Sequence, residues 1–317
     1  MQDDATAVLK KHGKTFNFAR FFLGQKTGLA AARLYRFCRI VDDIADDSED
    51  KVQAKIDLDS LKNVILQNQL DHPEVGDFLR LCQTFNIDRT NGIILIEGVS
   101  QDLDFKAISN VKELIQYAYK VAGVVGLMMA PILEAKKNGS QFAIDLGIGM
   151  QLTNIARDVM EDAQMGRRYI PGNWVNELSA EQIAKGASSE HEAIQSAIAS
   201  LLKLAEDYYN SGMAGLYYLP NRNKQAIAVA AYVYREIGRK LRRHHYNYWQ
   251  GRTYVSTPQK IKLAGQAMWS LNTYQLANKA VEHKAQLHQH LDDVQTHNHS
   301  MQNIKEQKSK SDKPASA

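Results

Sequence analysis

Two pairs of aspartates have the same spacing in this sequence. Asp42 and Asp46 lie in VDDIADD, and Asp158 and Asp162 lie in NIARDVMED. Because four residues make slightly more than one helical turn, each pair projects two carboxylates from one helix face. Mg²⁺ prefers oxygen ligands and commonly bridges protein carboxylates to substrate phosphates. Two such faces turned toward one cavity predict a site for magnesium and diphosphate, where a diphosphate could ionise.

A single pair of this kind is more often part of a solvated acidic face. Three features favour a functional interpretation here. The spacing occurs twice, the second pair belongs to a segment that is otherwise apolar and amide-rich from Gly147 to Ala156, and an arginine stands close to each pair. Buried carboxylates need partners of this kind.

Basic residues supply the other half of a diphosphate site. Arg39 lies three positions before Asp42, and Arg157 directly precedes Asp158. Arginine binds phosphate oxygens through a bidentate fork, and lysine acts as a point charge. The candidates for phosphate contacts are Lys14, Arg39, Arg157 and Arg252. The simpler interpretation, an ion pair with a neighbouring carboxylate on the surface, is given to Arg33, Arg167 and Arg168.

Helices must position these side chains. Apolar residues recur at intervals of three and four over residues 27–47, 52–69, 88–103, 111–137, 140–163, 190–219, 222–250 and 258–290, as in core-facing helices. A further short helix is expected to begin at Ser179. The pattern predicts an all-α protein. No composition shift or long linker divides residues 1–290, so one large helical domain is expected.

The sequence changes character near His283. From there to the end it holds half of the ten histidines among Gln, Lys, Ser and Asp, with hardly any bulky apolar residue. Such a composition does not offset the entropy of ordering, so we expect a solvated tail, with residues 291–317 as a polar C-terminal extension. Metal binding by these histidines is the alternative.

Composition narrows the function classes. The net charge is only +4 and the isoelectric point is about 8.8, which gives no argument for nucleic-acid binding. Cys38 and Cys82 form no CxxC motif, which argues against a disulfide scaffold or a structural zinc site and fits a cytoplasmic protein. The apolar run from Val121 to Leu133 is too short to cross a bilayer. Neither a dinucleotide fingerprint nor a P-loop occurs.

Five segments together resemble a known family. They are HGKTFNFAR, LYRFCRIVDDIADD, YAYKVAGVVGLMMAPIL, QLTNIARDVMEDAQMGRRYIP and GRTYVS, in this order between about residues 12 and 265. They are similar to the head-to-head prenyl synthases, the phytoene and squalene synthase family, and most similar in motif to bacterial phytoene synthases. The resemblance implies a single helical domain of the isoprenoid synthase type with a central cavity.

The resemblance also implies residue roles. The metal ligands would be Asp42, Asp46, Asn154, Asp158 and Asp162. The diphosphate contacts would be Lys14, Arg39, Gln151, Asn154, Arg157, Tyr234 and Arg252. The four aspartates would be catalytic together with Tyr119, whose ring would face the reacting carbocation. Gly13 departs from the family, in which a serine usually stands beside the lysine.

The implied reaction is a Mg²⁺-dependent transfer, with Mn²⁺ as an alternative ion. Two geranylgeranyl diphosphates would condense to phytoene through a cyclopropylcarbinyl diphosphate, in carotenoid biosynthesis and without NADPH. The alternative substrates are two farnesyl diphosphates, giving squalene, dehydrosqualene or hydroxysqualene. A terpene cyclase or chain-elongating synthase, and a non-catalytic relative, are further hypotheses. An insoluble product leads us to expect peripheral contact with lipid at the inner membrane surface.

A hydrocarbon substrate also needs an apolar channel. Ala122, Gly126 and Ala130 recur every four residues along one helix face. They could leave room for a prenyl chain, with Phe16, Val121, Val125, Leu127 and Met128 as apolar walls. Close helix packing through small residues explains the same pattern equally well.

Overall fold

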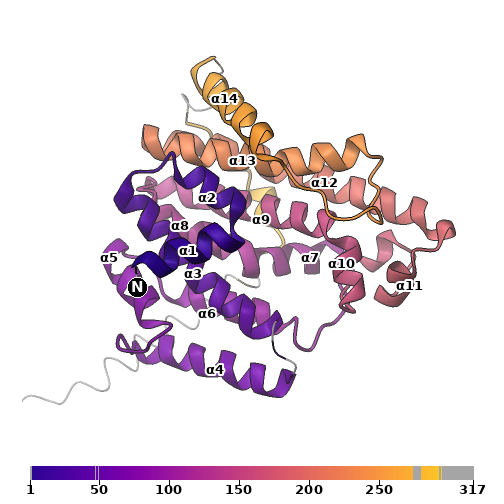
Figure 1. Ribbon diagram of the computed structural model, residues 1–317, viewed down its shortest axis with the longest axis horizontal. Helices are drawn as coiled ribbons and strands as arrows, with labels where there is room; N and C mark the ends of the chain where they lie inside the picture. Colours follow the sequence, from indigo (N-terminus) through magenta and orange to yellow (C-terminus); the bar gives the residue numbers. More distant parts are fainter. Residues whose placement is uncertain (1, 47, 49, 274–279, 293, 295–317) are drawn as a thin grey trace, which may run out of the picture.

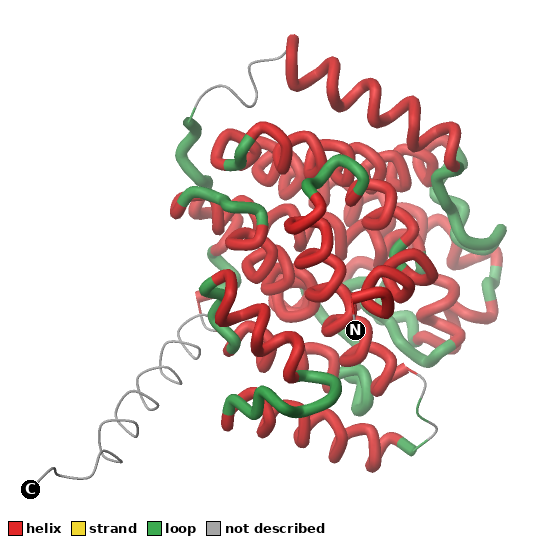
Figure 2. The backbone as a smooth tube through the Cα atoms, turned by 60° about the vertical axis from the view of Figure 1, so that its left-hand side comes forward, coloured by secondary structure: helices red, strands yellow, loops and turns green. Residues whose placement is uncertain are grey.

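The computed structural model describes residues 2–46, 48, 50–273, 280–292 and 294. The regular elements in these ranges are all helical, and the ranges contain no strand (Figure 2). This confirms the predicted all-α class. Most of the predicted polar extension, residues 295–317, lies outside the described residues.

The first half of the chain forms eight α-helices. They are α1 (Gln2–His12), α2 (Lys14–Arg20), α3 (Gln25–Asp46), α4 (Lys51–Gln67), α5 (Gly76–Phe85), α6 (Thr90–Ser100), α7 (Val111–Ala118) and α8 (Val124–Ile132). A π-helical turn, Tyr119–Gly123, joins α7 to α8. The sequence pattern predicted α3, α4, α6 and the α7–α8 run, but not α1, α2 or α5.

Further α-helices follow in the described part of the second half. They are α9 (Ser140–Arg157), α10 (Val159–Gln164), α11 (Ala180–Lys185), α12 (His191–Ala214), α13 (Asn221–Arg243) and α14 (Thr257–Thr273). Short 3₁₀ turns lie at Lys137–Gly139, Gly172–Trp174, Ser188–Glu190, Gly215–Tyr218 and Ala285–His288. The prediction of one helix over 258–290 is wrong for residues 280–284, which are irregular, and residues 274–279 lie outside the described residues.

Local signals explain several helix ends. The Asp50 side chain accepts hydrogen bonds from the backbone N–H groups of Val52 and Gln53 and so caps α4. Ser179 and Gln182 form a capping box at the start of α11, as predicted. Helix α13 ends seven residues before its predicted limit, because His245 and Tyr246 adopt left-handed backbone conformations just after it.

Helix α9 runs through the middle of the molecule and packs against α8, α12 and α13 (Figure 1). Helix α3 contacts α1, α4, α5, α6 and α8. Helices α4 and α14 lie at opposite ends of the molecule in this view. Helix α3, which carries Asp42 and Asp46, and helix α9, which ends directly before Asp158, are therefore interior scaffold elements.

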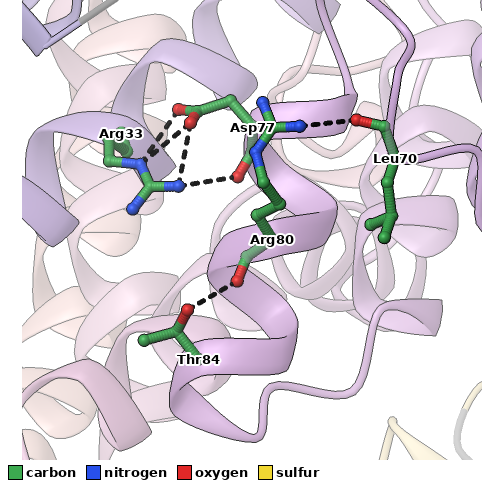
Figure 3. Close-up of polar contacts among 5 residues, drawn as sticks. All are labelled: Arg33, Leu70, Asp77, Arg80 and Thr84. Atoms are coloured by element: carbon green, nitrogen blue, oxygen red, sulfur yellow. Dashed lines mark hydrogen bonds and ion pairs between the residues drawn. The ribbon is translucent and has the colours of Figure 1, made fainter.

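An ion pair fixes α3 against α5. The guanidinium group of Arg33 donates to both carboxylate oxygens of Asp77, with its closest contact at 2.8 Å, and to the Asp77 carbonyl at 3.1 Å (Figure 3). Arg80 of α5 in turn donates to the Leu70 carbonyl at 2.6 Å. Arg33 pairs with a carboxylate as predicted, but Asp77 lies 44 positions away and both side chains are mostly buried, not on the surface.

The helical run from Val111 to Ile132 is long and apolar enough to cross a membrane by length and composition. It is longer than the apolar run considered in the sequence, because the π-helical turn joins α7 to α8. Half of its most apolar window is buried inside the protein, and α8 packs against α9. Core packing accounts for this apolar character.

The chain from Val281 to Leu291 packs against the helices. The hydroxyl of Tyr218 donates to the Val281 carbonyl at 3.2 Å, and that of Tyr208 donates to the Leu287 carbonyl at 2.8 Å. Leu291 is fully buried. The expectation of a solvated tail from His283 onward is therefore wrong up to Leu291, because distant tyrosines and helix side chains satisfy its polar groups.

Glycines allow α8 and α9 to cross closely. A Cβ added at Gly126 would lie 2.1 Å from the Ala143 carbonyl oxygen, and one added at Gly147 would lie 2.3 Å from that of Ala122. Both contacts are with backbone atoms, which cannot rotate away as a side chain can. The small-residue pattern on α8 therefore reflects close helix packing.

We predict that Gly126→Ala lowers the free energy of unfolding by about 1–3 kcal/mol, because the extra methyl group forces α8 and α9 apart. The matched control is Gly265→Ala on α14, where an added Cβ meets nothing within 4 Å. It should be neutral or stabilising by up to about 1 kcal/mol, because alanine has the higher helix propensity. Urea unfolding measures both variants, and equal effects would contradict the packing argument.

Candidate functional site

The two aspartate pairs lie at helix ends. Asp42 and Asp46 occupy the last turn of α3. Asp158 stands between α9 and α10 with non-helical backbone angles, and Asp162 follows on α10. The backbone N–H of Asp162 still donates to the Asp158 carbonyl at 2.8 Å. The predicted continuous helix over 140–163 is thus interrupted at Asp158, but the one-turn relation within the pair is preserved.

Arg167 connects the two pairs. Its Nη1 lies 3.0 Å from Oδ1 of Asp46, and its backbone N–H donates to the Asp162 carbonyl at 2.8 Å. Burial and the charge of Asp158 raise the pKa of Asp162, and the charge of Arg167 opposes part of this rise. The sequence predicts that Arg167 pairs with a neighbouring carboxylate on the surface. Its partner Asp46 is exposed but lies 121 positions away, and Arg167 also contacts the Asp162 carbonyl, so the two helix ends face one region.

A fifth carboxylate lies in the same region. Asp102 is buried and accepts hydrogen bonds from the hydroxyls of Tyr117 at 3.0 Å and Tyr169 at 2.8 Å. Its charge raises the pKa of both Asp42 and Asp162. Sequence reasoning missed Asp102, because it has no motif spacing and its partners are distant in sequence.

Burial and mutual repulsion hold protons on these carboxylates. Burial, followed by the charge of Asp46, raises the pKa of Asp42 to about 7. Burial, followed by the charge of Asp158, raises the pKa of Asp162 to about 8. Burial raises the pKa of Asp102 to about 6, although both tyrosine hydrogen bonds oppose this shift. Carboxylates crowded in this way favour the binding of cations.

Two arginines hold Asp158. Nε of Arg157 lies 2.7 Å from Oδ1, and Nη2 lies 2.5 Å from Oδ2. Arg252 reaches the same carboxylate from the Gly251–Ser256 loop, with Nε and Nη2 each 2.9 Å from an oxygen. Two guanidinium charges on one carboxylate leave positive charge at this end of the site. The expected role of both arginines toward phosphate stays a prediction.

The other predicted cations lie at the edges. Arg39 pairs with Asp43, one turn along α3, and Arg39 Nε is buried without a hydrogen-bond partner among the described residues. Lys14 is exposed at the start of α2, and its carbonyl oxygen accepts from Lys260 Nζ at 3.3 Å. Lys260 is buried, and burial together with the charge of Lys14 lowers its pKa. Lys260 was not among the sequence candidates.

A cavity of about 320 Å³ adjoins the acidic region. Its polar end is lined by Asp42, Gln151, Asn154 and Tyr234. Its apolar lining comes from α2, α3, α8, α9 and α13 and includes Phe16, Leu34, Val121, Val125, Met129, Leu133, Phe142 and Leu146. This arrangement, a charged mouth on an apolar chamber, is what a prenyl diphosphate requires.

The predicted walls are partly confirmed. Phe16, Val121 and Val125 line the cavity, whereas Met128 is fully buried in the core. Ala122, Gly126 and Ala130 also line the cavity. The two interpretations of this small-residue face therefore hold together: it packs closely on α9 and also borders the chamber.

Aromatic rings gather near the polar end. The Phe16 ring lies 5.4 Å from that of Tyr234 and 6.1 Å from that of Tyr35, measured between centroids. Tyr119, in the π-helical turn, is buried but is not among the described residues that line the cavity. Its role toward a carbocation stays a prediction.

Gly13 gives Tyr35 its position. A Cβ at residue 13 would lie 2.9 Å from the Tyr35 ring and 2.7 Å from Leu9 Cδ1. The serine that is usual in the family would therefore displace the ring or Leu9. Here the space is taken by an aromatic wall of the cavity.

The donor set fits a hard divalent cation. Asn154 Nδ2 donates to Gln151 Oε1 at 3.3 Å, which leaves Asn154 Oδ1 buried without a hydrogen-bond partner in the described part of the chain. An amide oxygen beside several carboxylates matches the ligand preference of Mg²⁺ or Mn²⁺. Asp42, Asp46, Asn154, Asp158 and Asp162 are thus suited to hold such an ion.

The raised pKa values predict how pH affects the metal-free protein. Because the folded state binds protons more tightly than the unfolded state, these carboxyls lower stability as pH rises from about 4 to about 8. Asp162→Asn removes the group with the pKa of about 8. In the presence of a chelator, we expect the melting temperature of Asp162→Asn, relative to that of wild type, to increase as pH rises from 5 to 8.

The variant is compared with wild type at each pH, so the titration of histidines common to both proteins cancels. Added Mg²⁺ should stabilise wild type more at pH 8 than at pH 5, because the ion must displace protons. A difference in melting temperature that does not change with pH would show that Asp162 carries no raised pKa.

Comparison with known proteins agrees with this geometry. A family model for squalene/phytoene synthase matches residues 9–259. The 15-cis-phytoene synthase of Pantoea ananas is 34% identical over 283 residues, which cover 84% of this chain and 92% of the relative. That of Paracoccus sp. strain N81106 is 33% identical over 261 residues, covering 78% and 84% respectively.

Solved structures confirm the expected isoprenoid synthase fold. A dehydrosqualene synthase in complex with ligand is 29% identical with a TM-score of 0.75, covering 86% of this chain and 96% of that one. A squalene synthase from Alicyclobacillus acidocaldarius shares the fold at 18% identity, with a TM-score of 0.68 and coverage of 77% and 94%. From the match of the family model and these relatives, the chain belongs to the squalene/phytoene synthase family and is a prenyltransferase.

Proposed function

We propose that this protein condenses two molecules of geranylgeranyl diphosphate head to head to phytoene, with Mg²⁺ and through a cyclopropylcarbinyl diphosphate. The observation that carries the proposal is the link through Arg167 between the two aspartate pairs, beside an apolar cavity that Asp42 lines. The similarity to 15-cis-phytoene synthases at 33–34% identity supports the choice of product.

In this proposal the polar end of the cavity holds the diphosphates. Mg²⁺, when bound by the carboxylates and Asn154, would neutralise charge on the leaving diphosphate. Arg157 and Arg252 would exchange part of their contact with Asp158 for phosphate oxygens, which accept the same bidentate fork. Arg39 and Lys14 would add charge at the edges of the site. Lys260 lies beside Lys14 and would add to it.

The condensation then proceeds in two stages. The C–O bond of one diphosphate breaks, the double bond of the second substrate attacks the allylic cation, and loss of a proton closes the cyclopropane ring. Loss of the second diphosphate gives a cyclopropylcarbinyl cation, which rearranges to the central carbon–carbon bond and loses a second proton. Two diphosphates and two protons leave for each phytoene formed.

The cavity wall protects the cations. Phe16, Tyr35 and Tyr234 line the same cavity as Asp42, and aromatic rings stabilise nearby cations by about 0.5–2 kcal/mol. Burial raises the pKa of the Tyr234 hydroxyl, and the charge of Asp158 adds to this rise. The hydroxyl therefore stays protonated. An apolar lining keeps out water that would quench the intermediates.

A second candidate is condensation of two farnesyl diphosphates to dehydrosqualene or a related C30 product. It is favoured by the structural similarity to a dehydrosqualene synthase, at 29% identity and a TM-score of 0.75. The two candidates use the same polar site and differ in the length of the apolar chain.

Product analysis separates the candidates. The purified protein is incubated with each diphosphate and Mg²⁺, with and without NADPH, and the extracted hydrocarbons are identified by chromatography and mass spectrometry. We expect phytoene from geranylgeranyl diphosphate, with no requirement for NADPH. Squalene as the only product would overturn the choice of substrate, and diphosphate release from neither substrate would overturn the proposal.

The same assay tests the acidic site. Asp162→Asn should lower kcat by a factor of about 100 or more, as removal of one group that stabilises developing charge commonly does. Asp59→Asn, at an exposed position of α4, serves as the matched control and should keep wild-type activity. Full activity of Asp162→Asn would remove Asp162 from the site.

We also propose peripheral contact with lipid at the inner membrane surface, through α14. Ile261 and Trp269 of this helix are about 60% exposed. Helix α14 packs against α13, and Lys260 links it to α2, which lines the cavity with Phe16. An apolar product that leaves the cavity beside α2 would therefore contact the lipid that α14 touches.

Co-sedimentation with liposomes tests this surface. Trp269→Ser should reduce binding several-fold, because tryptophan anchors proteins at the lipid interface. Val52→Ser on α4 removes an equally exposed apolar residue from the opposite end of the molecule and should bind as wild type does. Equal binding by both variants would place the contact elsewhere.

A further inference from the structure

Asp145 of α9 lies on the side of the helix that faces away from the cavity. The lining residues Ala143, Gly147, Met150 and Asn154 follow one helix face, and Asp145 is about half a turn from it. Its side chain is fully buried. It belongs to neither aspartate pair, and the condensation makes no use of it.

Three polar groups converge on this carboxylate. Ser211 of α12 donates its hydroxyl to Oδ2 at 2.5 Å. Nε2 of His283 lies 2.8 Å from Oδ2, and Nε2 of His288 lies 2.8 Å from Oδ1. Both imidazoles are largely buried, with 6% and 11% of their side chains exposed. The group therefore joins α9, α12 and the C-terminal segment.

Asp145 has no permanently charged cation as a partner among the described residues. Among the described residues, its hydrogen-bond and ion-pair partners include neither lysine nor arginine. A buried carboxylate without a cationic partner is costly. Two imidazole nitrogens and one carboxylate, all within 4.8 Å of one another, are a common ligand set for borderline divalent metals.

We propose that Asp145, His283 and His288 form a binding site for a divalent transition-metal ion, with Zn²⁺ as the preferred class. The ligands are imidazole and carboxylate, so the absence of paired cysteines does not bear on it. With three protein ligands, the site has a fourth position for water or the Ser211 hydroxyl. The ligand types separate it from the all-oxygen site at the cavity mouth, which suits Mg²⁺.

The bound ion would fasten the C-terminal segment behind the cavity. The His283 ring packs edge-on against Phe142, at 5.3 Å between centroids, and Phe142 also stacks on Tyr218 at 5.4 Å. Phe142 lines the apolar part of the cavity. The metal would therefore hold His283, which packs against Phe142 in the cavity wall. The tyrosine hydrogen bonds at Val281 and Leu287 secure the segment on either side of His283.

Metal binding is measured directly, so its outcome does not depend on the condensation assay. The full-length protein is freed of metal with a chelator, dialysed and titrated with Zn²⁺ or Mg²⁺ by calorimetry. Three proteins are compared: wild type, His283→Gln/His288→Gln, and His297→Gln/His299→Gln. The last controls for the other histidines near the C-terminus. Melting temperature is followed in parallel.

We expect one Zn²⁺ site in wild type and in His297→Gln/His299→Gln, and its loss in His283→Gln/His288→Gln. Free Zn²⁺ at 100 times the dissociation constant should lower the unfolding equilibrium constant about 100-fold. Mg²⁺ should not compete. Equal Zn²⁺ stoichiometry in wild type and His283→Gln/His288→Gln, or its loss only in the other variant, would overturn the proposal.

A spectroscopic measurement needs no variant that disturbs folding. Co²⁺ replaces Zn²⁺ in such sites and reports its coordination by visible absorption. With His297→Gln/His299→Gln as the protein, we expect one equivalent of Co²⁺ to give the intense bands of a four-coordinate ion, and Zn²⁺ to abolish them. The weak spectrum of hydrated Co²⁺ alone would show that the cluster is held only by hydrogen bonds, contrary to the proposal.

Discussion

Repulsion among buried carboxylates is the constraint on which the active region depends. Asp42, Asp102 and Asp162 all have raised pKa values, because burial and neighbouring negative charges both oppose ionisation. Such a group of acids is unfavourable in an isolated fold. Arg167 and the arginines at Asp158 offset part of the repulsion. The remaining unbalanced charge is what makes the site receptive to metal ions.

Helix α9 positions both the cavity and the Asp145 cluster. Small residues let its neighbours approach: Gly147 admits the backbone of Ala122, and Gly212 of α12 lies against Leu146. One face therefore carries the cavity from Phe142 to Asn154, while the opposite face carries Asp145. Because a helix is rigid over this length, the polar end of the cavity, its apolar end and the Asp145 contact with the C-terminal segment are fixed relative to one another.

The sequence predicted what depends on local pattern. Helical periodicity identified α3, α9 and α12, and the repeated spacing identified Asp42, Asp46, Asp158 and Asp162. It did not identify Asp102, whose partners Tyr117 and Tyr169 lie 15 and 67 positions away, or the attachment of His283 to Asp145, 138 positions apart. The polar composition after His283 resembles a solvated tail because its partners belong to distant helices, and only the fold brings them together.

Chain-length selection follows from the same geometry. Along α9, the polar end at Asn154 and the apolar end at Phe142 are twelve residues apart, or about 18 Å at 1.5 Å per residue. In the proposed reaction, a prenyl chain with its diphosphate at the acidic end extends toward Phe142, Gly139 and Leu216, which also line the cavity. The depth available there decides between a shorter and a longer substrate. That depth is set by the packing of Tyr218 and the C-terminal segment behind Phe142, not by any residue of the aspartate motifs. Two relatives with identical acidic motifs can thus differ in product length, which is why those motifs identify the reaction class more readily than the substrate.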